Sequence, residues 1–195
     1  KVEGLTVRSS EAPDLPPLFQ ADAIYVRPRV GRIVKGFLDF SELRITAPKI
    51  HYYVGADGKS NIPRGEGDGG KIPDYGIAQA DIRNGAFLYE EIPRQIKLAL
   101  PRWNLNLAGE EGTRAHILDF FSLQASSFTY ESFHLPIDRI ALRGKLKRTD
   151  LKLEHAQLSA IQSQLSLHGT IENFASPVFD LRMNPTVDLS ALARA

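Results

Sequence analysis

The feature that most constrains the fold is a two-residue alternation of apolar and polar side chains, which recurs along most of the chain. Leu165 and Leu167 alternate with Ser166 and His168, and the same pattern returns at residues 178–183. Successive residues of a β-strand point to opposite faces, so each such segment has one apolar and one polar face. This pattern is typical of antiparallel sheet.

Strand signals return roughly every 10–15 residues, and no segment predicts a strong helix longer than two turns. A chain of 195 residues fits one domain, so residues 1–195 are interpreted as a single mainly-β domain. A meander, a sandwich and a solenoid-like sheet all fit this pattern. The predicted strands are 5–8, 21–27, 37–40, 43–46, 50–54, 77–82, 86–90, 96–100, 103–107, 137–142, 144–147, 150–158, 164–171 and 178–183.

Several connecting segments have their own signatures. Asp57-Gly58 and Asn84-Gly85 predict tight turns, because the glycine of each pair tolerates a positive φ angle. The second turn is expected between the two strands of a hairpin. Residues 64–74 are rich in Gly and Asp, which predicts a flexible loop. Residues 113–125 fit either a helical face or a strand, and their β-like flanks favour the strand. Residues 30–35 could form one helical turn, and a short helix could begin in 189–194.

Composition argues against several functional classes. A net charge of +1 supplies no field that would favour nucleic acid. The absence of cysteine excludes disulfides, thiolate catalysis and cysteine-ligated zinc. No apolar run reaches the roughly 18 residues of a membrane span. The chain starts without Met or a signal peptide, so we interpret it as a fragment whose upstream membrane anchor has been removed.

No pattern of residues predicts catalysis, a metal site or a cofactor. Residues 65–71 match the spacing of a phosphate-binding loop, but Ile72-Pro73 follows instead of a helix, and Glu66 and Asp68 would repel phosphate. The five histidines are scattered without metal-ligand spacing. Glu90 and Glu91 are adjacent on a predicted strand, so their carboxylates should point to opposite faces. The sequence therefore favours a non-enzymatic protein.

The order of several short phrases resembles the AsmA-like family, which includes TamB. The family's recurring strand, proline break and turn are matched by residues 43–63, which read LRITAPKIHYYVGADGKSNIP. The opening VEGLTVR at 2–8, the strand IRNGAFLY at 82–89 and the phrase SQLSLHGTI at 163–171 are similar to further family phrases in the same order. Glu90 or Glu91 stands where the family usually has Asp.

The resemblance implies a periplasmic protein, anchored in the inner membrane of a diderm bacterium. It implies an elongated, curved antiparallel sheet with a hydrophobic groove and at most short helices. It also implies a role in phospholipid transport between the inner and outer membranes and in outer-membrane biogenesis. The family offers no catalytic residues to transfer, and Asp57, Gly58 and Asn61 are interpreted as turn residues rather than as a site.

An apolar strand face needs a cover, which is either a second sheet or a ligand such as an acyl chain. Two clean alternations are separated by Pro101: the even-numbered residues of 96–100 share one face, and the odd-numbered residues of 103–107 share another. An alternative function is a scaffold that binds outer-membrane β-barrel proteins by strand addition at an exposed edge. The candidate groove residues are Ile96, Leu98, Leu100, Leu105, Leu107, Leu165, Leu167, Phe179 and Leu181.

Overall fold

A computed structural model of the chain describes residues 1–29, 38–63, 75–110, 115–174 and 176–192. The predicted helical turn at 30–35 and the predicted flexible loop at 64–74 both lie outside these residues. The strands are β1 Val2–Val7, β2 Phe19–Pro28, β3 Leu38–Thr46, β4 Lys49–Val54, β5 Tyr75–Ile77, β6 Gln79–Glu91, β7 Ile96–Gly109, β8 His116–Ser122, β9 Ser126–Tyr130, β10 Phe133–Ile137, β11 Arg139–Leu146, β12 Leu151–Ala160, β13 Ser163–Glu172 and β14 Val178–Thr186.

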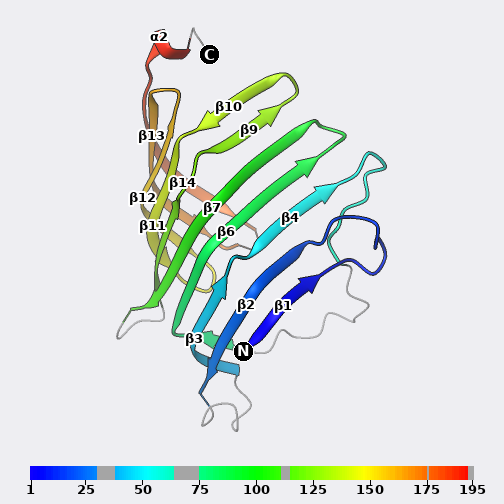
Figure 1. The fold of residues 1–195 in the computed structure, drawn as a ribbon. Coiled ribbons are helices and arrows are strands. Elements are labelled where there is room, and N and C mark those ends of the chain that lie inside the picture. Colours follow the sequence, from blue (N-terminus) through cyan, green and yellow to red (C-terminus); the bar gives the residue numbers. More distant parts are fainter. Residues whose placement is uncertain (30–37, 64–74, 111–114, 175, 193–195) are drawn as a thin grey trace.

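All fourteen described strands belong to one curved sheet, which confirms the predicted mainly-β fold (Figure 1). Its order is β14-β13-β12-β11-β8-β7-β6-β4-β2-β3-β5, with β1 beside β2 and β9 joining β7 to β10. The sheet is mixed rather than purely antiparallel, because β6 runs parallel to both β3 and β4, and β3 runs parallel to β5. The one described helix, α2 Leu189–Leu192, is short, as expected.

The N-terminal region, β1–β6, is held by buried polar groups. Asn61 is completely buried, and its side-chain oxygen accepts a hydrogen bond of 2.9 Å from the backbone N–H of Tyr53. Its amide nitrogen donates to the carbonyl oxygens of His51 and of Pro16, at 3.0 Å for Pro16. Asn61 therefore ties β4 to two connecting segments. We refer to it as the Asn61 clamp.

The turn before this clamp has the predicted chemistry. Gly58 adopts a φ of 77°, which glycine reaches without steric strain. The side chain of Asp57 accepts a hydrogen bond of 3.1 Å from the backbone N–H of Lys59. A backbone bond of 2.8 Å from Gly55 N–H to the Lys59 carbonyl closes the loop.

The C-terminal region, β11–β14, is a simple antiparallel meander. Each strand pairs with the next in sequence through a short turn. Burial falls toward the open edge, and every residue of β14 is exposed. Large apolar side chains stay exposed there, with Phe179 63% exposed and Met183 64% exposed.

The predicted hairpin turn at Asn84-Gly85 is wrong, because β6 continues through it as a thirteen-residue strand. Asn84 does adopt a positive φ of 54°, but it forms a β-bulge instead of a turn. Its backbone N–H donates to the side chain of Asn104 on β7, and its side-chain oxygen accepts from Arg102. The neighbouring strand thus holds the irregular backbone in place. The ambiguous 113–125 segment contains strand β8, as favoured.

Candidate functional site

The nine candidate groove residues all lie on one face of the curved sheet. Residues paired across neighbouring strands share a face, so the strand register traces a row from Leu105 through Phe120 and Leu142 to the C-terminal strands. We call this face the inner face. It includes Ile96, Leu98, Leu100, Leu105 and Leu107 of β7, Leu165 and Leu167 of β13, and Phe179 and Leu181 of β14.

A bulge brings the two apolar runs of β7 onto the same face, whereas the sequence placed them on different ones. Phe87 of β6 pairs with Leu100, but Gly85 pairs with Trp103, so Pro101 and Arg102 together occupy the place of one residue. This extra residue reverses the alternation between Leu100 and Trp103. The inner face of β7 therefore stays apolar along its length.

The middle of the inner face is built around Trp103. A Cβ atom added at Gly85 would lie 2.5 Å from the indole ring, so only glycine leaves room for Trp103 to lie across β6. The indole also packs against Phe120, with ring centroids 5.7 Å apart. Trp103 is only 6% exposed. Trp103 thus joins β6, β7 and β8 at this level of the face.

At the end where the β6–β7 turn lies, the inner face becomes aromatic and polar. The rings of Tyr52 and Tyr89 stack with centroids 5.1 Å apart. The hydroxyl of Tyr89 donates a 2.7 Å hydrogen bond to Glu91, and this bond is the main cause that raises the pKa of Tyr89 above its ordinary value. Arg94 forms an ion pair with the same carboxylate at 3.3 Å.

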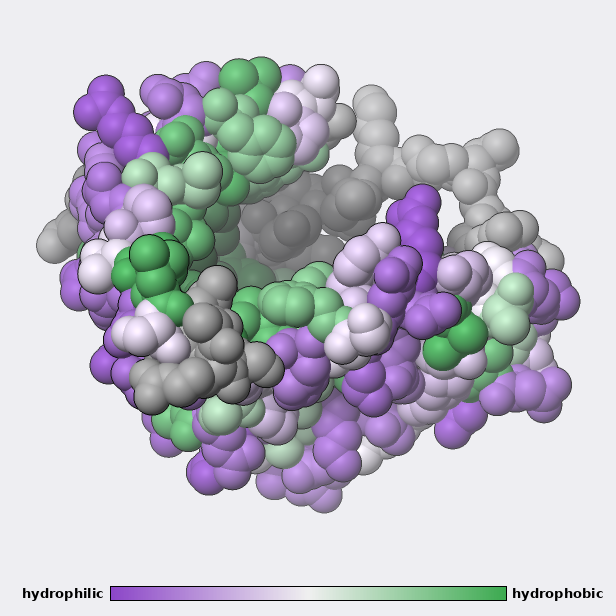
Figure 2. Space-filling model, turned by 90° about the horizontal axis from the view of Figure 1, so that it is seen from above, coloured by the Kyte–Doolittle hydropathy of each residue, from purple (hydrophilic) through white to green (hydrophobic). Residues whose placement is uncertain are grey.

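The inner face is not sealed by a second layer among the described residues. Figure 2, which looks down onto the end where the β6–β7 and β9–β10 turns lie, shows hydrophobic side chains around a hollow and hydrophilic ones on the outside. The chain exposes 13038 Å², whereas a compact monomer of 21.7 kDa exposes about 9,200 Å². Most apolar residues of this face are half-buried. We call the hollow and its inner face the trough.

The hairpin β9–β10 adds aromatic residues that sequence reasoning missed. Ile96 pairs with Tyr130, and Leu98 pairs with Phe128, so β9 extends the inner face beyond β7. Phe133 and Leu135 of β10 continue the row. A signal was present, because Phe128-x-Tyr130 and Phe133-x-Leu135 alternate on either side of the two-residue turn Glu131-Ser132.

The outer face of β4, β6 and β7 is polar and ion-paired. Glu90 contacts His51 at 2.7 Å and Lys97 at 2.9 Å, while Glu91 points to the inner face, as the alternation predicted. Burial opposes ionisation of Glu90, but the hydrogen bonds from Lys97 and His51 outweigh it and hold the pKa of this carboxyl below its usual range. The contacts are those of a structural ion-pair cluster.

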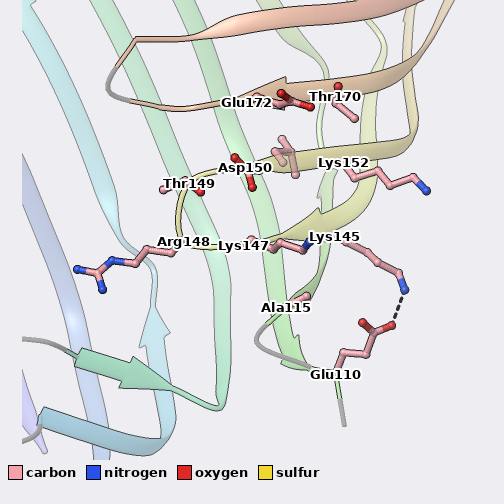
Figure 3. A pocket seen from close by; sticks show the side chains of 11 residues that line it. Glu110, Ala115, Lys145, Lys147, Arg148, Thr149, Asp150, Lys152, Thr170 and Glu172 are labelled. Carbon is pink, nitrogen blue, oxygen red and sulfur yellow. Dashed lines mark hydrogen bonds and ion pairs between the residues drawn. The ribbon is translucent and has the colours of Figure 1, made fainter. Parts of the chain in front are cut away.

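A separate pocket of about 720 Å³ lies where β11 and β13 end and β12 begins, at the opposite end of the strands from the β6–β7 turn (Figure 3). Lys145 and Lys152 project to one side, opposite to Arg148, and Lys145 is paired with Glu110. The register places Lys145 and Lys152 on the outer face, opposite each other. The lining mixes cations with Asp150 and Glu172, so the charges largely cancel and favour no particular ligand.

Within the residues that the structure describes, no three His, Asp or Glu side chains come together as metal ligands. None of the helices in that part of the chain is long and apolar enough to cross a membrane. Comparison with protein-family models, with curated proteins and with solved structures finds no match. The resemblance to the AsmA-like family therefore depends on the quoted residues alone.

Proposed function

We propose that this domain is a non-enzymatic carrier whose trough holds the acyl chains of phospholipids. The observation that carries the proposal is the continuous apolar inner face, which runs from β4 to β14 and stays half-exposed within a curved sheet. Water contact along such a face is unfavourable by about 25 cal/mol per Å², and a hydrocarbon chain would remove it. The apolar residues offer no directional partner, so the trough would select acyl chains by shape rather than by polar contacts.

The biological setting that we propose follows from the family resemblance. In that setting the domain lies in the periplasm, anchored to the inner membrane, and contributes to phospholipid transport toward the outer membrane. The alternative role, capture of a β-barrel strand during outer-membrane assembly, would use the open edge at β14 rather than the trough.

Native mass spectrometry of the purified chain tests the trough. We expect phospholipid to be retained by the wild type and lost on Leu98→Asp, because a carboxylate on the inner face must be desolvated by an acyl chain. Phe121→Asp is the matched control, since Phe121 is 38% exposed and its strand register places it on the outer face. Lipid-free wild-type protein would contradict the proposal.

A second variant distinguishes loss of lipid binding from unfolding of the domain. Met183 lies on the inner face of β14 but is 64% exposed, so it contributes little to any core. We expect Met183→Asp to weaken lipid retention while the circular dichroism spectrum of the β-sheet stays unchanged. Unchanged retention in both Leu98→Asp and Met183→Asp would show that lipid binds elsewhere.

A further inference from the structure

Exposed apolar side chains gather on two turns at one end of the trough. Ile92, in the β6–β7 turn, is 46% exposed. Tyr130 and Phe133, which flank the β9–β10 turn, are 46% and 55% exposed. Turns at strand ends are normally rich in Gly, Asn, Asp and Ser, because they face water. Three large apolar side chains at such positions indicate a surface that meets something other than water.

The two turns lie side by side and are tightly constrained. The backbone N–H of Glu131 donates a 3.0 Å hydrogen bond to the carbonyl of Gln95, which connects one turn to the other. Both residues have a φ of 52°, as tight turns require. Tyr130 pairs directly with Phe133 across the hairpin and with Ile96 on β7. The three side chains are thus presented by ordered backbone.

This end of the sheet, formed by residues 92–95 and 130–133, is named the aromatic end; it is at the top of Figure 1. Its apolar residues are continuous with the inner face, because Tyr130 pairs with Ile96 of that face. Three charged residues lie at or beside this end: Arg94, which is paired with Glu91, and Glu131, which is exposed in the β9–β10 turn. The opposite end, around the turn 147–150, carries the charged residues Lys147, Arg148 and Asp150 beside the exposed Phe174 of the β13–β14 turn.

We propose that the aromatic end docks on the surface of a lipid bilayer, with Ile92, Tyr130 and Phe133 entering the interfacial region. Tyrosine and phenylalanine are favoured at that depth, because their rings leave water while the tyrosine hydroxyl stays hydrated. Because Tyr130 pairs with Ile96, an acyl chain could pass from the bilayer to the trough along apolar side chains, beside the Glu91–Arg94 ion pair. The proposal rests on the proposed function for its purpose, but docking is measured separately from lipid retention.

Site-specific labelling tests which end meets the bilayer. The chain has no cysteine, so Ser132→Cys at the aromatic end and Thr149→Cys at the opposite end can each carry one polarity-sensitive dye. With vesicles of phosphatidylethanolamine and phosphatidylglycerol, we expect a blue shift of the emission at position 132 and none at position 149. Equal shifts at both positions, or none at either, would overturn the proposal.

Substitution of the three apolar residues provides the second arm. Combining Ile92→Ser, Tyr130→Ser and Phe133→Ser should weaken vesicle binding by about a hundredfold, from roughly fivefold for each half-exposed side chain. Phe174→Ser is the matched control, because Phe174 is 43% exposed and lies in the β13–β14 turn, at the same end of the strands as 147–150. It should leave vesicle binding unchanged.

The outcomes separate docking from the trough itself. A triple variant that loses vesicle binding but keeps phospholipid in native mass spectrometry supports docking and leaves the trough intact. A triple variant that binds vesicles like the wild type overturns the docking proposal, whatever the lipid content. Self-association of the wild type through these residues in sedimentation velocity, without vesicle binding, would instead assign the aromatic end to a second copy of the chain.

Discussion

The two ends of the chain form the same sheet by different means. In the N-terminal region, β1–β6, several strands pair out of sequence order, such as β2 with β4 and β3 with β6, and the buried Asn61 clamp fixes the connections. In the C-terminal region, β11–β14, each of β12, β13 and β14 pairs with the strand before it, and exposure rises toward the edge. The comparison shows that buried hydrogen bonds fix the strand connections in the first region, whereas the second region leaves apolar side chains exposed.

The largest expected effect comes from breaking the clamp. Asn61→Leu would leave the backbone N–H of Tyr53 and the carbonyls of Pro16 and His51 without their partner inside the protein. We expect the free energy of unfolding to fall by about 3–5 kcal/mol, measured by urea denaturation. The same change on exposed β14, Asn184→Leu, should stay within about 0.5 kcal/mol. Equal losses at the two positions would erase the contrast between the regions.

A smaller effect is expected from crowding the centre of the inner face. Gly85→Ala would place a methyl group 2.5 Å from the Trp103 ring and should destabilise the protein by about 1–3 kcal/mol. Trp103 is the sole tryptophan, so its fluorescence reports the displacement directly. Combining Gly85→Ala with Trp103→Phe should recover part of the loss caused by Gly85→Ala. Purely additive effects would show that the ring is not what the new methyl group meets.

The smallest effect concerns pH and the outer face of the N-terminal region. The pKa of Glu90 is lowered in the folded state, so the folded protein favours the carboxylate more than the unfolded chain does. Its stabilisation is therefore complete above the unfolded value of about 4.5 and is lost as pH falls through the folded pKa. Glu90→Gln should remove this dependence, and Lys97→Met should reduce it. If the wild type and Glu90→Gln lost stability in parallel below about pH 5, near the ordinary pKa of a glutamate, Glu90 would not be the source of this pH dependence.

Much of the fold could be predicted because alternation is a local property. Leu165 and Leu167, or Phe179 and Leu181, mark a strand and its apolar face without knowledge of any partner. The parallel pairing of β3 and β4 with β6 could not be predicted, since it depends on contacts between residues such as Ile45 and Ile82 that lie far apart in the sequence. Asn84 shows how far local prediction reaches. Its sequence indicated a positive φ, but its contacts with Asn104 and Arg102 on β7 decide that it forms a bulge rather than a turn.

The candidate groove residues were predicted as apolar strand positions, yet their arrangement was not. Nothing local indicates that Leu100 and Trp103 share a face, because the reversal depends on how β7 pairs with β6. The aromatic end was missed for a different reason. Tyr130 and Phe133 belong to short strands whose alternation is clear only once the intervening turn is recognised.

The bulges of β6 and β7 have a consequence for how this sequence can change over evolutionary time. Each strand carries one extra residue at nearly the same level, and the register before and after the pair of bulges is the same. Loss of a single residue from one strand would turn half of that strand inside out, and polar side chains would enter the trough. Insertions and deletions should therefore survive in the turns, or arise in compensating pairs on adjacent strands, so the length of each strand is inherited jointly with that of its neighbour.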